Sequence, residues 1–285
     1  ERRRIEEAEH AVHYIWSAHE AADEPGGTEA AVRERKSSMR LPEENLLYFI
    51  ESYSPALQPW ERQILRIVRN IAQYFYPQRQ TKVMNEGCAC FVHYHILNRL
   101  HQAGRIGDGA MLEILHNHTG VLYQPNFDDP SYSGINPYTI GYAMMTDIQR
   151  ICADPTEEDR AWFPDIAGCK DWRNVLKDAW AGYRDESFIQ QFLSPKVMRD
   201  LRLFALSDAG NEKFYRVAAI HDEAGYRAVR DALARANNPS LSDPDIQVVD
   251  VDLLHDRVLH LQHRAASGIP LAEEEVRQMI AASPE

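Results

Sequence analysis

The stretch RDLRLFALSDAGNEKFYRVAAI, from Arg199 to Ile220, decides the fold class of this chain. Apolar residues alternate with other residues on both sides of the turn-forming run 208–211, a pattern typical of a β-hairpin. Upstream of this stretch, apolar residues instead recur at spacings of three and four, as they do on one face of a helix. Because the period changes here, we predict an α+β protein with a domain boundary between residues 195 and 199.

The residues before this boundary predict a large, mostly helical domain over 43–198, preceded by a charged helix and linker over 1–42. Pro77 is expected to end the second helix and Gly120 to cap the fourth. The predicted helices cover residues 46–55, 59–77, 82–102, 109–116, 137–153, 156–161 and 172–185. In the second helix, one face is apolar and carries Ile64, Ile67, Val68, Ile71 and Phe75.

The residues after the boundary predict a small domain over 199–285. A helix is expected over 223–236, strands over 246–251 and 258–263, and a last helix from Leu271. Together with the hairpin, these elements give the order β-β-α-β-β-α, which is typical of one small sheet covered on one face by helices.

The charge balance excludes several classes of partner. Among 285 residues, 31 are Lys or Arg and 43 are Asp or Glu, so the net charge is −12. Such a surface repels polyanions, and we expect no nucleic-acid binding.

No apolar run approaches the roughly 18 to 20 residues that a membrane span needs, so we expect no span. Four scattered cysteines favour reduced thiols and a cytoplasmic location. The chain begins with Glu1 inside a charged helical pattern, which predicts a fragment of a longer protein.

Glu86 and His93 are the candidate site residues. They lie seven positions apart in the third predicted helix, so both project from one face and can converge on one site. His95 lies about 200° further round and must point elsewhere. Gly87 is unfavourable inside a helix unless another backbone or a ligand packs closely there. The alternative is that Glu86 and His93 pair with each other or with an arginine of a neighbouring helix.

Other combinations of metal-binding residue types favour structural roles. His116 and His118 have a spacing that suits a strand better than a helix end, which favours structural or capping roles. Cys88 and Cys90 have no second pair at zinc-ribbon spacing and suit small core positions. The segment His19–Asp23 is similar to a His-Glu-x-x-His motif but has Asp in place of the second histidine.

The loop at 121–137 is rich in Tyr, Pro, Asn and Asp and is long for a compact domain. Loops of this length tend to be functional, so its side chains could line a pocket. Equally, the tyrosine hydroxyls could serve only to anchor the loop. The chain has no Walker loop, no Gly-x-Gly-x-x-Gly and no Gly-x-Ser-x-Gly, so the common nucleotide and hydrolase motifs are absent from the sequence.

Several blocks together resemble the stage V sporulation protein R (SpoVR-like) family over essentially residues 40–265, as the C-terminal portion of a longer protein. The blocks are ENLLYF (44–49), QILRIVR (63–69), QYFYPQ (73–78), VMNEG (83–87), YSGINPY (132–138), PTEED (155–159), WFPDIAG (162–168), DESF (185–188) and FLSPKVMRD (192–200). After Asn-Glu-Gly the family typically has Trp-Ala, whereas this chain has Cys88-Ala89, which puts any role of that aromatic residue in doubt. The resemblance implies a bacterial, cytoplasmic protein that acts in spore cortex formation or, in species without spores, near a PrkA-type serine kinase.

Two classes of function follow from the resemblance. One is a regulatory or scaffold protein of sporulation or stress response, with residues 199–285 as an interaction module. The other is a metal-dependent hydrolase, because Asn85-Glu86-Gly87-x-Ala89 is similar to the helix that supplies the glutamate ligand in thermolysin-like zinc peptidases. Glu86, with His93 nearby, would then bind zinc together with histidines of a missing N-terminal region. No catalytic residue is assigned, and the metal content of the full-length protein would separate the two classes.

Overall fold

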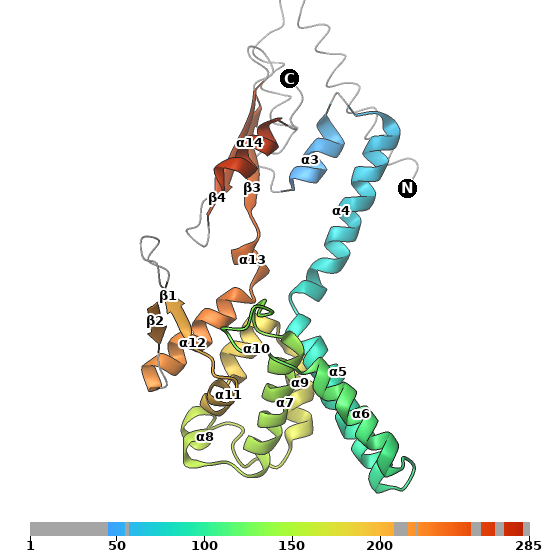
Figure 1. Ribbon diagram of the computed structural model, residues 1–285. Helices are drawn as coiled ribbons and strands as arrows, with labels where there is room; N and C mark the ends of the chain where they lie inside the picture. The colour runs from blue at the N-terminus through green and yellow to red at the C-terminus, as the bar shows by residue number, and fades with distance from the viewer. Residues whose placement is uncertain are drawn as a thin grey trace, which may run out of the picture. The chain divides into compact units, whose positions relative to one another are not determined.

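The computed structural model describes residues 45–54, 57–207, 216–219, 222–251, 258–265 and 271–281 (Figure 1). The chain divides into two compact units. The larger unit spans residues 77–239, and the smaller one combines residues 1–76 with residues 240–285. The segment His19–Asp23 and the hairpin turn at 208–211 lie outside the described residues.

Two long helices, α5 (Lys82–Gln102) and α7 (Pro137–Ala153), form the centre of the larger unit. They cross with almost no space between their backbones. A Cβ atom added to Gly87 would lie 2.4 Å from the backbone of Gly141, and one added to Gly141 would lie 2.3 Å from the carbonyl oxygen of Val83. The close backbone approach expected at Gly87 is therefore confirmed.

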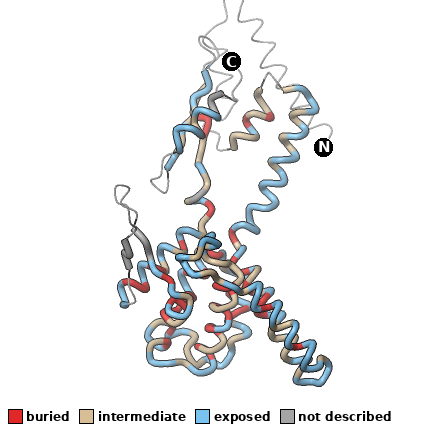
Figure 2. The backbone as a smooth tube through the Cα atoms, in the orientation of Figure 1, coloured by how far each residue is buried: buried red, intermediate tan, exposed pale blue. Residues whose placement is uncertain are grey.

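The remaining helices of the larger unit surround this pair. They are α6 (Asp108–Val121), α8 (Glu157–Trp162), α9 (Trp172–Gly182), α10 (Asp185–Phe192), α11 (Pro195–Asp200) and α12 (Glu223–Ala236). Burial is concentrated where α7 meets α9, α10 and α11, as the red segments of Figure 2 show. Met144, Ile148, Leu176 and Phe188 have no solvent-exposed surface there.

Two short strands, β1 (Ala205–Ser207) and β2 (Arg216–Ala219), pair antiparallel and lie against α12. The hairpin predicted from the change of period is present, although Leu201 and Leu203 precede β1 instead of belonging to it. Leu201 is the C-cap of α11, and Leu203 donates its N–H to the carbonyl of Met198.

The smaller unit contains α3 (Leu46–Tyr53), most of α4 (Pro59–Arg79), β3 (Asp245–Val251), β4 (Leu259–Arg264) and α14 (Glu273–Ala281). A short helix, α13 (Pro239–Ser242), precedes β3. Strands β3 and β4 pair antiparallel, with a bulge between Val248 and Asp250. Val248 and Phe49 of α3 are the buried residues of a small apolar core.

The α+β class is confirmed, and so is the element order predicted for residues 199–285, apart from the additional helix α13. The expectation of a single sheet is wrong, because β1–β2 and β3–β4 form two separate two-stranded sheets. Element order alone does not determine which strands pair. The three-part domain division at residues 42 and 198 stays a prediction.

Some helix ends differ from those predicted. Helix α4 continues past Pro77 to Arg79 and therefore does not end at the proline. Helix α6 continues past Gly120, and Leu122 is its C-cap. The helix expected over 172–185 ends at Gly182, and α10 and α11 follow without having been predicted. A capping box of Thr156 and Asp159 begins α8, close to the start of the helix predicted over 156–161.

No helix among the described residues combines the length and the apolar character that crossing a membrane requires.

Candidate functional site

Glu86 lies on α5 at the side facing the start of α7. Its carboxylate interacts with the hydroxyl of Tyr138 and raises the pKa of Tyr138. Tyr138 directly follows Pro137, the first residue of α7, and its N–H is capped by the side chain of Asn136. Glu86 is therefore held beside the end of the loop at 121–137.

His93, two turns further along α5, lies against α6 instead. Its ring stacks on that of His118 with centroids 5.7 Å apart, and Tyr94 stacks on the same histidine at 5.7 Å. His118 is 8% exposed, and its Nε2 has no hydrogen-bond partner among the described residues. Burial and then the neighbouring His93 lower the pKa of His118, so its imidazole is neutral at pH 7.

Cys90 and Tyr142 lie between these two groups. Cys90 is buried, and burial followed by the charge of Glu86 raises the pKa of its thiol. The thiol is therefore protonated and a poor nucleophile. Tyr142 of α7 meets the ring of His118 edge-on at 5.4 Å, and burial raises its pKa. We call these residues the tyrosine–histidine cluster: Glu86, Cys90, His93, Tyr94, His118, Tyr138 and Tyr142.

The cluster connects Glu86 and His93 only indirectly. Glu86 acts on the pKa of Tyr138, whereas the ring of His93 stacks on that of His118. Within the described part of the chain, no three His, Cys, Asp or Glu side chains are grouped so that they could hold a metal ion. These residues alone do not fit zinc, and the roles of Glu86 and His93 as ligands stay a prediction.

Three further candidate residues, His95, His116 and Cys88, lie outside the cluster. His95 points away from His93 and stacks on Trp172, with centroids 5.6 Å apart. The carbonyl of His116 accepts a hydrogen bond from the hydroxyl of Thr119 in the last turns of α6. Cys88 is half-buried and packs against the core.

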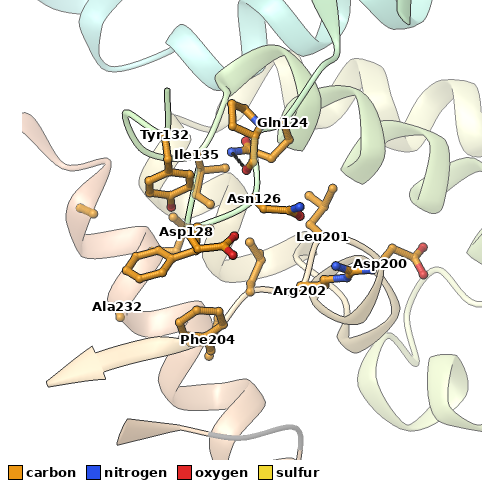
Figure 3. A pocket seen from close by; sticks show the side chains of 16 residues that line it. Gln124, Asn126, Asp128, Tyr132, Ile135, Asp200, Leu201, Arg202, Phe204 and Ala232 are labelled. Carbon is orange, nitrogen blue, oxygen red and sulfur yellow. Dashed lines mark hydrogen bonds between the residues drawn. The ribbon is translucent and has the colours of Figure 1, made fainter. Parts of the chain in front are cut away.

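The loop at 121–137 lines the larger of the two pockets described here, of about 860 Å³ (Figure 3). Gln124 and Asn136 fix the loop. Asn136 donates its N–H to Gln124 Oε1 at 2.7 Å and its side-chain amide to the carbonyl of Val121 at 2.9 Å. The pocket volume lies within the range of small-molecule sites. The prediction that this loop could line a pocket is confirmed.

Sequence reasoning missed the opposite wall of this pocket. This wall is formed by Asp200, the last residue of α11, and by the residues after it, Leu201, Arg202 and Phe204, with residues of α12 completing the lining (Figure 3). Arg202 has a φ of 51°, in the left-handed region that favours glycine. No sequence signal marks this position, because an arginine after a helix does not announce a left-handed conformation.

Comparison with known proteins gives consistent matches. The family model described as SpoVR like protein matches residues 1–241, and the one described as SpoVR-like C-terminal domain matches residues 244–282. A curated relative from Escherichia coli (strain K12), named Uncharacterized protein YcgB, is 52% identical over 243 residues, which cover 85% of this chain and 48% of the relative. The chain thus spans about half the length of this relative. No solved structure matches this chain. Since the first family model alone covers most of the sequence, the chain belongs to the SpoVR family.

Proposed function

We propose that this chain is a regulatory or scaffold protein that acts by binding another protein. The observation that carries this proposal is the apolar stripe of α4, formed by Ile64, Ile67, Val68, Ile71 and Phe75. Each of these side chains is between 47% and 51% exposed. Contiguous exposed apolar surface of this kind marks interaction sites.

Arginines on the other face of α4 form ion pairs with α3, and the apolar stripe therefore faces away from α3. Arg66 Nε lies 2.6 Å from Glu51 Oε1, and Arg69 lies 3.1 Å from Glu51 Oε2. Arg62 donates to the backbone carbonyls of Glu51 and Ser54. Glu51 is only 6% exposed. Because the arginine face of α4 is held against α3, its apolar face points away, opposite to the usual arrangement of an amphipathic helix.

We also propose a pathway, a cellular location and a source of the partner. The family resemblance supports sporulation, specifically spore cortex formation, or a stress response, in the cytoplasm and with a PrkA-type serine kinase pathway as the source of the partner. The name of the Escherichia coli relative assigns no activity and does not favour either sporulation or stress response.

In-cell crosslinking tests the proposal. The protein carrying Ile67→Asp and Ile71→Asp should lose a specific crosslinked partner that the unaltered protein retains. Gln73→Asp is the matched control, because Gln73 is exposed on the opposite side of the same helix. A partner set unchanged by the two stripe substitutions would contradict the proposal. A PrkA-type kinase absent from the set would reject only that partner.

A second proposal, a zinc-dependent hydrolase with Glu86 and His93 as ligands, is favoured by the unpaired Nε2 of buried His118 beside His93. Further donors would have to come from outside the described residues. Metal analysis of the full-length protein tests it. Glu86→Gln should lower the zinc content, and a protein that takes up no zinc on titration would reject the hydrolase.

A further inference from the structure

A second, smaller pocket of about 230 Å³ lies between α5 and α9. Its floor is apolar: Phe91 is 2% exposed and Leu176 is fully buried. Its rim is also apolar but open to solvent, with Val92 38% and Ile96 52% exposed. We call this surface the α5–α9 groove.

The groove extends over two turns of each helix. On α9, its lining residues Trp172, Leu176 and Trp180 recur every four positions, and on α5 Val92 and Ile96 do the same. Trp172 joins the two helices, because its ring meets that of Phe91 at 5.8 Å. A trough of this shape, with apolar side chains at helical intervals on both sides, matches the grooves that bind an amphipathic helix.

The charged residues of the groove are all basic. Arg99, Arg173 and Lys177 line it, and no Asp or Glu is among the lining residues. No ion pair to a carboxylate involves any of the three in the described parts of the chain, and Arg173 instead lies over the ring of Trp172 at 5.0 Å. This concentration of positive charge stands out in a chain whose net charge is −12.

The size of the pocket also restricts the ligand. Its volume is below the roughly 300 to 1,000 Å³ of typical small-molecule sites. It suits one or two apolar side chains inserted from a partner that continues along the open rim. Unpaired basic side chains around an apolar centre are complementary to carboxylates placed around an apolar anchor.

We propose that the α5–α9 groove binds a short acidic amphipathic helix of a partner protein. Apolar side chains of that helix fill the space between Ile96 and Trp180, and its carboxylates pair with Arg99, Arg173 and Lys177. This inference rests on the proposed function and names the chemistry of a partner at a surface separate from the apolar stripe.

Selection from a random library of 16-residue peptides displayed on phage tests the inference on the whole chain. Peptides enriched on the unaltered protein should carry three or more Asp or Glu residues around apolar residues spaced four apart. The variant carrying Arg99→Glu, Arg173→Glu and Lys177→Glu should bind these peptides at least tenfold more weakly. Replacing the acidic residues of a selected peptide by Lys should restore binding to this variant.

The matched control is Lys82→Glu, Arg105→Glu and Arg235→Glu, which makes the same change of charge at exposed positions outside the groove. It should leave peptide binding within about twofold. If the groove variant fails to fold, Ile96→Asp supplies a second test, since Ile96 is exposed. Selected peptides without acidic enrichment, or equal binding to the groove and control variants, would overturn the inference.

The two proposals can fail separately. If the groove variants keep every peptide while the stripe substitutions on α4 still remove a crosslinked partner, only the groove inference falls. If the stripe substitutions change no partner and the peptides behave as expected, the groove inference stands and the role given to the stripe falls.

Discussion

Asp185 begins α10 and also holds the amino end of α5, about a hundred residues earlier in the chain. Its carboxylate accepts hydrogen bonds from the N–H groups of Val83 at 2.8 Å and Met84 at 2.9 Å. These are orphan donors of the first helical turn, and a negative charge there is also favoured by the helix dipole. Burial nevertheless dominates, and it raises the pKa of Asp185 to about 6 against the opposing hydrogen bonds.

The raised pKa of Asp185 predicts a stability that falls as pH increases from about 4 to about 6. In this range the folded state keeps the proton that the unfolded state releases, so the unfolded state gains with rising pH. A shift of about two units corresponds to about 3 kcal/mol at most. Urea unfolding at several pH values measures it. Asp185→Asn is neutral at every pH and should lack this slope, and an unchanged slope in that variant would assign the effect to another group.

Arg202 occupies a left-handed position after α11 that glycine would fill without strain. Arg202→Gly should therefore raise the free energy of unfolding by about 0.5 to 1 kcal/mol, since relief of strain exceeds the added entropy of the unfolded chain. Arg202→Ala keeps the strained backbone and should give no such gain. Denaturant midpoints compare the two variants. A stabilisation of the same size in both would show that removing the guanidinium, and not the strain, is responsible.

At the scale of elements, the contact of α5 with α7 sets the geometry of the tyrosine–histidine cluster. Gly141→Ala would place a methyl group 2.3 Å from the carbonyl oxygen of Val83 and 2.7 Å from the Cα of Gly87. Both neighbours are backbone, so the helices must move apart. We expect a loss of about 3 kcal/mol, or failure to fold.

The control for this contact is Gly109→Ala in α6, where an added Cβ meets nothing within 4 Å. This change should be neutral or stabilising by up to about 1 kcal/mol, because alanine favours a helix. Thermal unfolding of both variants measures the difference. Equal effects would mean that the α5–α7 crossing adapts to a methyl group.

The sequence predicted those features that depend on residues close to one another along the chain, such as helices and the residues that share a helix face. The sequence predicted helices over 82–102 and 137–153, where α5 and α7 lie, and the spacing within α5 separated His95 from His93. The same reasoning could not predict which face of a helix is buried and which is exposed to solvent. The pattern of α4 identifies which apolar residues share a face, but the orientation of that face depends on Glu51, and the sequence favoured a buried face as readily as an exposed one. The cluster partners of Glu86 and His93 come from α6 and α7, and sequence spacing within one helix carries no signal for such contacts.

For the whole molecule, the packing of α12 decides where the chain divides. Tyr226 and Val229 of α12 belong to the same buried core as α7 and α10. Arg230 donates to the carbonyl of Leu193 at 2.6 Å and lies over the ring of Trp162 at 4.5 Å, and burial lowers its pKa to about 10. These contacts favour a boundary near residue 239 over the predicted one near 199.

Limited proteolysis decides between the two boundaries. If the contacts of α12 dominate, a cut after Arg199 or Arg202 should leave residues 222–236 bound to the helical core, because separation would expose Tyr226 and Val229 to water. The two pieces should then elute together in gel filtration and separate only in denaturant. A further cut in the region 236–245 should not lower the melting temperature of the larger unit, and β3 should stay bound to α3 through the buried contact of Val248 with Phe49. If residues 199–285 instead leave as one folded piece, with the core unchanged, the boundary lies at 199 and the buried contacts of α12 contribute little.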